Sequence, residues 1–153
     1  MRSLTLQHDK ASALQILCLG AHSDDIEIGC GGTILRLACQ YPNCVFHWVV
    51  FSAIGPRAAE ARRGAKLFAG KNSSRSPALK TFQDGFMPFV GSEVKAVFED
   101  LKGKVSPDLI FTHYRGDAHQ DHRLLSELTW AIARAHRNID LPFRRDAIQH
   151  RGR

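Results

Sequence analysis

Two short polar clusters carry most of the residues that could do chemistry. One is His22-Ser23-Asp24-Asp25 and the other is Asp117-Ala118-His119-Gln120-Asp121-His122, which together hold three imidazoles and four carboxylates. So many titratable groups are costly to bury without a partner, and a metal ion would supply one. Imidazole and carboxylate ligands suit Zn²⁺, and Fe²⁺, Mn²⁺ or Co²⁺ could bind in the same geometry. A catalytic zinc ion takes three protein ligands and leaves a position for water.

Each cluster directly follows a predicted strand. The strand Leu14–Ala21 contains the apolar run Ile16–Leu19 and leads into the first cluster, and the strand Leu109–His113 leads into the second. Short apolar runs bounded by turn residues are typical of buried strands. Because ligands bind beyond the carboxyl ends of parallel strands, both clusters are expected at the same edge of one sheet.

The remaining sequence alternates between strand and helix patterns. This alternation predicts an α/β fold with a mostly parallel, doubly wound sheet and helices on both faces. The further strands are expected over Cys44–Ala53 and Leu79–Phe82. Helices are expected over Thr33–Cys39 after the glycine-rich entry Gly29–Gly32, over Ala58–Ala69, over Ser92–Leu101 with Ser92 as its cap, and from Asp121 or His122 to Ala135.

At 153 residues the chain is expected to form one domain. The prediction places that domain over residues 14–135, after an N-terminal arm over residues 1–13 and before a basic, poorly ordered tail over residues 136–153. Six Arg against two Asp give residues 134–153 a net charge of +4, which leaves +2 of the total +6 for the rest. A body this close to neutral argues against a nucleic-acid partner.

The remaining composition favours an ordinary globular protein. No apolar run approaches the roughly 20 residues that a membrane span needs. The four cysteines form no Cys-x-x-Cys pair, so they are interpreted as free thiols in a reducing cytoplasm. Whether the chain assembles into a homo-oligomer is left open.

The two clusters resemble the signature motifs of the PIG-L/LmbE-like family. The likeness rests on His22-Ser23-Asp24-Asp25 with Gly31-Gly32-Thr33, then on His119-Gln120-Asp121-His122, and it covers about Leu14 to Ala133. Arg57 and Glu60 match the family's R-x-x-E pattern. The family is one of metal-dependent de-N-acetylases that act on N-acetylglucosamine-type substrates and have a Rossmann-like α/β fold. Ser23 and Ile26 depart from the usual His-Pro-Asp-Asp-Glu motif, but no ligand position is lost.

The resemblance implies a role for each matching residue. The implied metal ligands are His22, Asp25 and His122. The implied catalytic residues are Asp24 as the general base, His119 as the group that stabilises the oxyanion, and Asp121 as the carboxylate that orients a histidine. Arg57 and Asp84 are the candidates for binding the substrate, a small acetamido sugar or glycoconjugate. An orienting carboxylate on a ligand histidine is the usual arrangement around a metal.

Several alternatives remain open at this point. Family members are usually longer, and the regular pattern is lost soon after Trp130, so the domain is expected to be incomplete at its C-terminus. One alternative function is therefore a truncated, catalytically inactive relative that binds metal or a partner, and another is a nucleotide-binding module. Arg57 could instead be a solvated residue at a helix start. His113 could support the site or serve only the packing of its strand.

Overall fold

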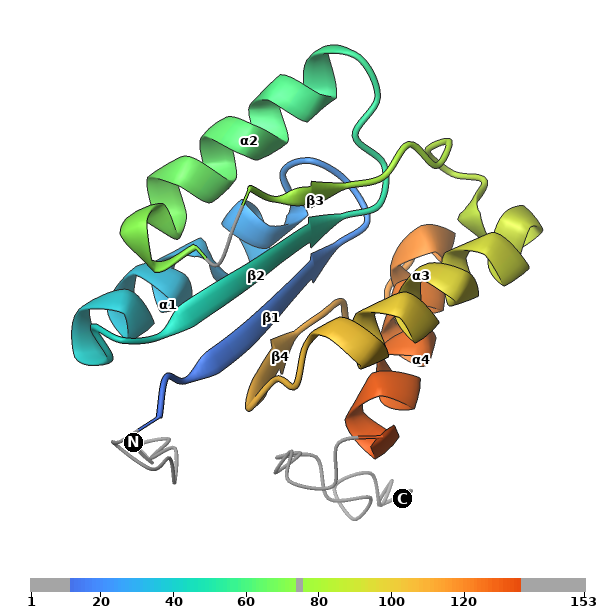
Figure 1. Ribbon diagram of the computed structural model, residues 1–153. Coiled ribbons are helices and arrows are strands. Elements are labelled where there is room, and N and C mark those ends of the chain that lie inside the picture. The colour runs from blue at the N-terminus through green and yellow to red at the C-terminus, as the bar shows by residue number, and fades with distance from the viewer. Residues whose placement is uncertain (1–11, 74–75, 136–153) are drawn as a thin grey trace, which may run out of the picture.

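The computed structural model describes residues 12–73 and 76–135, and strands and helices alternate along them (Figure 1). Most of the expected arm over residues 1–13, and all of the expected tail over residues 136–153, lie outside these ranges. The strands are β1 (Gln15–Gly20), β2 (Val45–Val50), β3 (Ala78–Leu79) and β4 (Leu109–Phe111). The helices are α1 (Asp25–Gln40), α2 (Pro56–Phe68), α3 (Gly91–Lys104) and α4 (Gln120–Ala135), with 3-10 turns η1 (Gly70–Asn72) and η2 (Met87–Val90).

The strands form one parallel sheet in the order β3-β2-β1-β4. β1 lies between β2 and β4, with Ile16 opposite both Phe46 and Leu109. The chain therefore builds outward from β1 in one direction and then crosses to its other side to form β4. The carboxyl ends of β1 and β4 flank the point where the strand order reverses, which is where open α/β sheets bind ligands. The predicted fold class is confirmed.

Helices cover both faces of the sheet, and the alternation of side chains along β1 supplies both cores. Ile16 and Cys18 belong to the core beneath α1 and α2, which lie on one side of the sheet in Figure 1. Leu17 and Leu19 belong to the core beneath α3 and α4 on the other side. In this second core the ring of Phe51 stacks on the ring of Phe98 in α3, with the ring centroids 5.2 Å apart. A strand buried on both faces explains why β1 is apolar throughout.

The predicted start of the first helix is wrong. The sequence places that start at Thr33 after a glycine-rich entry, but α1 begins at Asp25 and contains those glycines. Glycine weakens a helix because it has more freedom to lose on folding, and tertiary packing outweighs that preference here. A Cβ atom at Gly31 would lie only 2.5 Å from Cε1 of Phe68 in α2. The absence of a side chain at Gly31 therefore lets the two helices pack closely.

Two smaller predictions also differ from the structure. The cap of α3 is Val90 and not Ser92, which lies inside the helix and donates its hydroxyl to Glu93. The third strand is shorter than expected, with Thr81 joined to Ser52 only by an isolated antiparallel bridge. The 3-10 turn η2 ends at Val90, directly before α3, and irregular chain follows β3.

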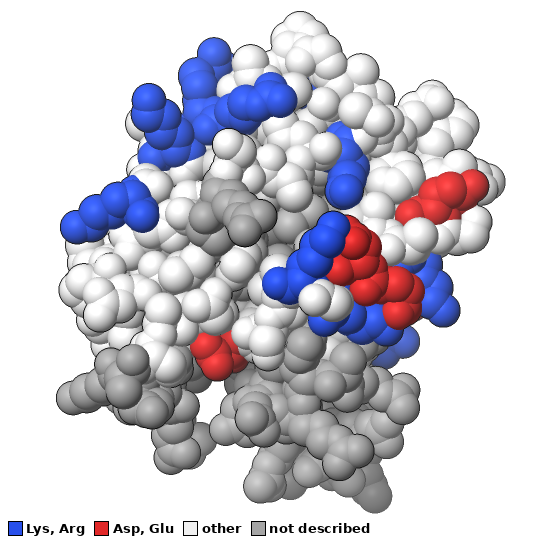
Figure 2. Space-filling view, in the orientation of Figure 1, with Lys and Arg blue, Asp and Glu red and all other residues white. Residues whose placement is uncertain are grey.

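Charged side chains on the face drawn in Figure 2 do not form one basic surface. Lys and Arg gather over α2, whereas α3 carries both signs. On α3, for example, Lys104 pairs with Asp100 at 2.6 Å. None of the helices in the described ranges is both long and apolar enough to cross a bilayer.

The packing of α1 on α2 leads to a prediction about two glycines of the same helix. Gly31→Ala is expected to lower the free energy of unfolding by about 1–3 kcal/mol, because its methyl group would press on Phe68. Gly32→Ala is the matched control, since a Cβ there meets nothing within 4 Å. The control is expected to raise the free energy of unfolding by up to about 1 kcal/mol through helix propensity. Urea unfolding of both variants measures the difference, and equal values would contradict the packing argument.

Candidate metal centre

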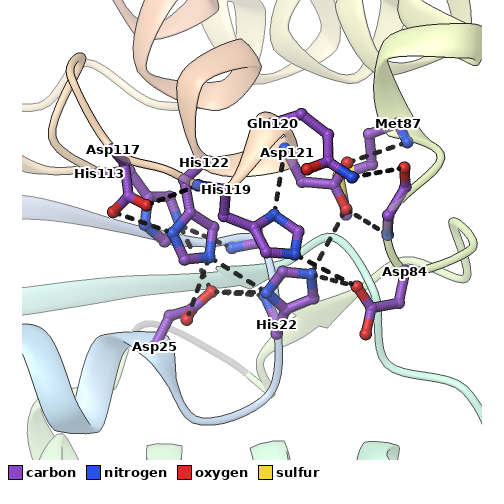
Figure 3. Close-up of polar contacts among 12 residues, drawn as sticks. His22, Asp25, Asp84, Met87, His113, Asp117, His119, Gln120, Asp121 and His122 are labelled. Atoms are coloured by element: carbon purple, nitrogen blue, oxygen red, sulfur yellow. Dashed lines mark hydrogen bonds and ion pairs between the residues drawn. The ribbon is translucent and has the colours of Figure 1, made fainter.

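The two polar clusters meet at the carboxyl edge of the sheet. His22 follows β1 after a single residue, and Asp25 opens α1. His119 immediately precedes α4, and His122 lies in its first turn. Figure 3 shows these side chains pointing toward one another, although His22 and His122 are 100 positions apart in the sequence. The predicted convergence of the two loops is therefore present in the structure.

Three of these side chains place polar atoms at nearly equal spacing. Nδ1 of His22 lies 3.2 Å from Nε2 of His122. Oδ2 of Asp25 lies 3.4 Å from Nδ1 of His22, and Oδ1 of the same carboxylate lies 3.5 Å from Nε2 of His122. Zinc binds imidazole nitrogen and carboxylate oxygen at about 2.0–2.1 Å, so tetrahedral ligand atoms are separated by roughly 3.3 Å. All three distances are close to this value, with a different oxygen of Asp25 next to each histidine.

Other combinations of ligands are close enough in space, and hydrogen bonds distinguish among them. In the described ranges, three groups hold potential ligand atoms within 4.8 Å of one another: His113 with Asp25 and His122, His119 with His22 and His122, and His22 with Asp84, His119 and Asp121. Nε2 of His113, however, accepts a hydrogen bond from the backbone N–H of Ala21 at 2.9 Å. Nδ1 of His119 accepts one from the backbone N–H of Asp121 at 3.2 Å, which leaves its Nε2 as the protonated nitrogen. Neither ring then offers a free lone pair to the centre.

Carboxylates lie against the outer nitrogens of the two remaining histidines. Oδ2 of Asp117 is 3.2 Å from Nδ1 of His122. Nε2 of His22 is 2.9 Å from Oδ1 of Asp84 and 3.4 Å from Oδ2 of Asp121. A carboxylate beside one nitrogen favours the tautomer with the proton there and frees the other nitrogen to bind a metal. The arrangement turns Nδ1 of His22 and Nε2 of His122 toward the centre.

The Asp121 carboxylate, besides lying against His22, also binds the backbone of the segment around Gly85 and Met87. The side chain is fully buried. Oδ2 accepts a hydrogen bond from the backbone N–H of Gly85 at 2.7 Å, and Oδ1 accepts one from that of Met87 at 3.2 Å. Gln120 adds a bond from its side-chain nitrogen to the carbonyl of Gly85. These bonds fix the segment that carries Asp84 against the start of α4.

Of the other residues singled out in the sequence, Asp84 contacts the histidines of this centre, whereas Asp24 and Arg57 have no such contact in the described ranges. Asp24 is exposed at the N-cap of α1, where its side chain makes no capping hydrogen bond. Asp84 is 70% exposed and approaches both His22 and, at 3.8 Å, Nε2 of His119. Arg57 is not brought to the cluster by any contact in the described ranges. It lies at the exposed start of α2 and pairs with Glu60 at 3.0 Å.

Two residues near the centre were not among the site residues that the resemblance implied. His113 stacks on His122 with ring centroids 3.9 Å apart, so it supports the orientation of that ring and is not only a packing residue of its strand. Asp117 belongs to the second cluster but matches no implied role. Its position two residues before His119 could have indicated from the sequence that Asp117 supports the site. In the structure its carboxylate also accepts a hydrogen bond from the backbone N–H of His119. The tautomer argument, in contrast, needs coordinates.

The charges in the cluster shift the pKa values of its members in opposite directions. Asp25 raises the pKa of His22 to about 9, although burial opposes the change. Burial acts to raise the pKa of Asp25, but the bonds from His22 and the neighbouring imidazoles bring it down to about 2. Burial lowers the pKa of His113 to about 4. Without a metal, a proton on His22 thus balances the Asp25 carboxylate.

These features define the class of the protein: an α/β protein with a His/Asp centre at the switch point of a parallel sheet. The family model described as PIG-L, GlcNAc-PI de-N-acetylase, matches residues 17–133. The chain belongs to this family of deacetylases. The uncharacterized deacetylase YaiS of Escherichia coli is 28% identical over 129 residues, covering 78% of this chain and 68% of YaiS.

Solved structures share the fold. A conserved protein from Thermus thermophilus superimposes with a TM-score of 0.61 at 21% identity, covering 79% of this chain and 56% of that one. The N,N'-diacetylchitobiose deacetylase of Pyrococcus horikoshii gives a TM-score of 0.60 at 22% identity, covering 85% of this chain and 53% of that one. The chain therefore spans just over half the length of these two structures.

The pKa shifts predict how the stability of the metal-free protein depends on pH. His22, whose pKa is raised to about 9, contributes stability that is full below pH 6.5 and lost as the pH rises through 9. His113, whose pKa is lowered to about 4, costs stability as the pH falls from 6.5 toward 4. The free energy of unfolding is therefore expected to peak near pH 6.5.

Urea unfolding of chelator-treated protein between about pH 5 and 9 tests this expectation. His113→Gln is expected to flatten the acid limb of the curve, because the group that titrates there is gone. A free energy of unfolding that rises steadily over the whole interval would contradict it.

Proposed function

We propose that this chain is a metal-dependent hydrolase that removes an N-acetyl group from an N-acetylglucosamine-type or related small acetamido substrate. The observation that carries the proposal is the spacing of Nδ1 of His22, the Asp25 carboxylate and Nε2 of His122, between 3.2 and 3.5 Å. Membership of the PIG-L family supports it. The metal would be held by His22, Asp25 and His122.

The donor set fits a divalent cation on chemical grounds. Two imidazole nitrogens and one carboxylate form a ligand set known for catalytic zinc, and Fe²⁺, Mn²⁺ or Co²⁺ would accept it as well. Neighbouring carboxylates of Asp117 and Asp121 would hold the rings of the two histidines in the ligating orientation. A bound Zn²⁺ would lower the pKa of water toward about 7 and polarise a carbonyl oxygen.

The side chains around this centre would each have a separate role in amide hydrolysis. The exposed carboxylate of Asp24, which has no capping bond to give up, would take a proton from the attacking water and return it to the leaving amine. Nε2–H of His119 would donate to the substrate oxygen as negative charge develops there. Asp84, exposed beside His22 and His119, would accept a hydrogen bond from a sugar hydroxyl. Arg57 would contact the far end of a larger substrate.

The comparisons support the substrate class. The family description names a de-N-acetylase of a GlcNAc conjugate, and one relative of similar fold is a diacetylchitobiose deacetylase. The cysteines, present as free thiols with Cys18 and Cys44 buried, support a reducing, cytoplasmic location. The alternative is an inactive relative that binds metal or a partner. The observation behind it is that the chain spans just over half the length of the two solved structures.

Metal analysis tests the ligand set. After chelation, reloading and dialysis, the wild-type protein is expected to retain one Zn²⁺ per chain. His122→Ala is expected to bind Zn²⁺ at least about tenfold more weakly, because one of three protein ligands is lost. His47→Gln is the matched control, since His47 lies in β2 and contacts Gln15. Stoichiometric zinc in His122→Ala would exclude the proposed centre.

Turnover by an Asp24 variant tests the catalytic role. Asp24→Asn is expected to lower kcat for an N-acetylglucosamine conjugate by about 10²–10⁴-fold with unchanged zinc content, because the general base is removed. Asp100→Asn, which changes an exposed carboxylate on α3, is expected to leave kcat unchanged. Normal turnover by Asp24→Asn would refute the assignment. A wild-type protein that holds zinc but cleaves no substrate would instead support the inactive relative.

A further inference from the structure

The segment that carries Asp84 is irregular, yet three hydrogen bonds tie it to the first turn of α4. The backbone N–H of Gly85 donates to Oδ2 of Asp121 at 2.7 Å, and that of Met87 donates to Oδ1 of Asp121 at 3.2 Å. The carbonyl of Gly85 accepts a hydrogen bond from Nε2 of Gln120 at 3.0 Å. Dashed lines in Figure 3 mark these bonds. Both polar backbone groups of Gly85 are therefore bound to the first two residues of α4.

Gly85 has a backbone conformation that other residues rarely adopt. Its φ is +78°, and in this left-handed region a Cβ atom comes too close to the following carbonyl oxygen. Space around the residue is not the restriction, because a Cβ at Gly85 would lie 3.5 Å from Nε2 of Gln120, an ordinary contact distance. The turn that leads the chain from Asp84 to the buried Met87 thus depends on the backbone freedom of glycine.

Asp84 immediately precedes this turn and places one carboxylate oxygen beside two histidines. Its Oδ1 lies 2.9 Å from Nε2 of His22 and 3.8 Å from Nε2 of His119. The side chain is nevertheless 70% exposed, so it can accept a further hydrogen bond from a bound molecule. Binding is costly when it must first order a mobile side chain or loop, and a backbone that is already fixed lowers that cost. The bonds to Gly85 supply such a fixed backbone.

We propose that Gly85 and Gln120 are positioning residues for sugar recognition. They hold the Asp84 carboxylate where it accepts a hydrogen bond from a hydroxyl group of the substrate's sugar ring. The inference rests on the proposed hydrolase function, in which Asp84 makes this contact. Loss of either residue then weakens the binding of a sugar amide and leaves the binding of an amide without hydroxyl groups unchanged. The bond between Gln120 and Gly85 involves none of the three proposed metal ligands, so zinc binding is retained.

Two amides with rings of the same size separate positioning from general damage. We measure kcat and KM of the zinc-loaded protein for N-acetylglucosamine, and the inhibition constant of N-cyclohexylacetamide, whose ring has no hydroxyl groups. Gln120→Leu removes the donor to Gly85 and is expected to raise KM about tenfold with kcat unchanged, because a hydrogen bond to a charged group is weakened in ground and transition states alike. The inhibition constant is expected to stay at the wild-type value.

The same substitution at Gln40, the exposed last residue of α1, is the matched control and is expected to change neither constant. An unchanged KM in Gln120→Leu would overturn the proposal and leave the hydrolase function intact. An equal rise in KM and in the inhibition constant would also overturn it, because the damage would then not depend on the hydroxyl groups.

Glycine variants test the backbone part of the proposal. Gly85→Ala is expected to raise KM for N-acetylglucosamine at least about fivefold, because alanine is strained in the left-handed conformation and the turn must shift. Gly70→Ala is the matched control, since Gly70 begins η1 with a φ of +52° and a Cβ there meets nothing within 4 Å. Both variants are expected to lose stability, but Gly70→Ala is expected to keep the wild-type KM. Equal KM values in the two variants would overturn the proposal.

A double-mutant cycle shows whether the effect passes through the Asp84 carboxylate. Asp84→Ala removes the acceptor, so Gln120→Leu is expected to change KM by less than about twofold in that background. A tenfold effect of Gln120→Leu in both backgrounds would overturn the proposal. Asp121 is unsuitable for this cycle because its carboxylate also lies against His22.

Binding of the product amine gives a readout that does not depend on turnover. In calorimetric titrations glucosamine is expected to bind the zinc-loaded wild-type protein about tenfold more tightly than Gln120→Leu, whereas cyclohexylamine binds both equally. If N-acetylglucosamine is not cleaved but glucosamine binds with this pattern, the positioning role stands and the hydrolase function fails. Glucosamine binding that is equal in the two proteins, or absent from both, would overturn the positioning role.

Discussion

The parallel pairing of β1 with β4 is the constraint on which the rest of the molecule depends. The register that places Cys18 opposite Phe111 brings the residues after both strands to one edge of the sheet. Two loops separated by most of the domain can then bring His22 and His122 within 3.2 Å of each other. A strand order without a reversal at this point would separate the two histidines, and no local feature of either loop could compensate.

The second general feature is a balance of charge around that edge. Asp25 sits among three imidazoles, and the carboxylates of Asp117 and Asp121 lie against the outer nitrogens of His122 and His22. Because each buried charge has a partner, the cluster can persist without a metal. The same partners define which nitrogens face inward, so one set of contacts serves both stability and ligand orientation.

The sequence predicted the features that follow from simple periodicity or from residue type. Apolar runs located β1 and β2, and the two polar clusters predicted a shared site that the structure does bring together. The start of α1 was missed because glycine is a poor helix former, and only the contact of Gly31 with Phe68 explains its presence. The family resemblance implied His22, and not His113 or His119, as a metal ligand, but no physical reason for that choice could be drawn from the sequence. The reason depends on which ring nitrogen accepts a backbone N–H, and that requires coordinates.

The carboxylate of Asp121 contacts both the loop before α3 and a histidine of the candidate metal centre. Its two oxygens serve the amides of Gly85 and Met87 as well as the imidazole of His22. Asparagine would offer one acceptor and would turn its NH₂ toward a group that also donates. A replacement of Asp121 would therefore disturb the loop that carries Gly85 and Met87 and the orientation of His22 at the same time.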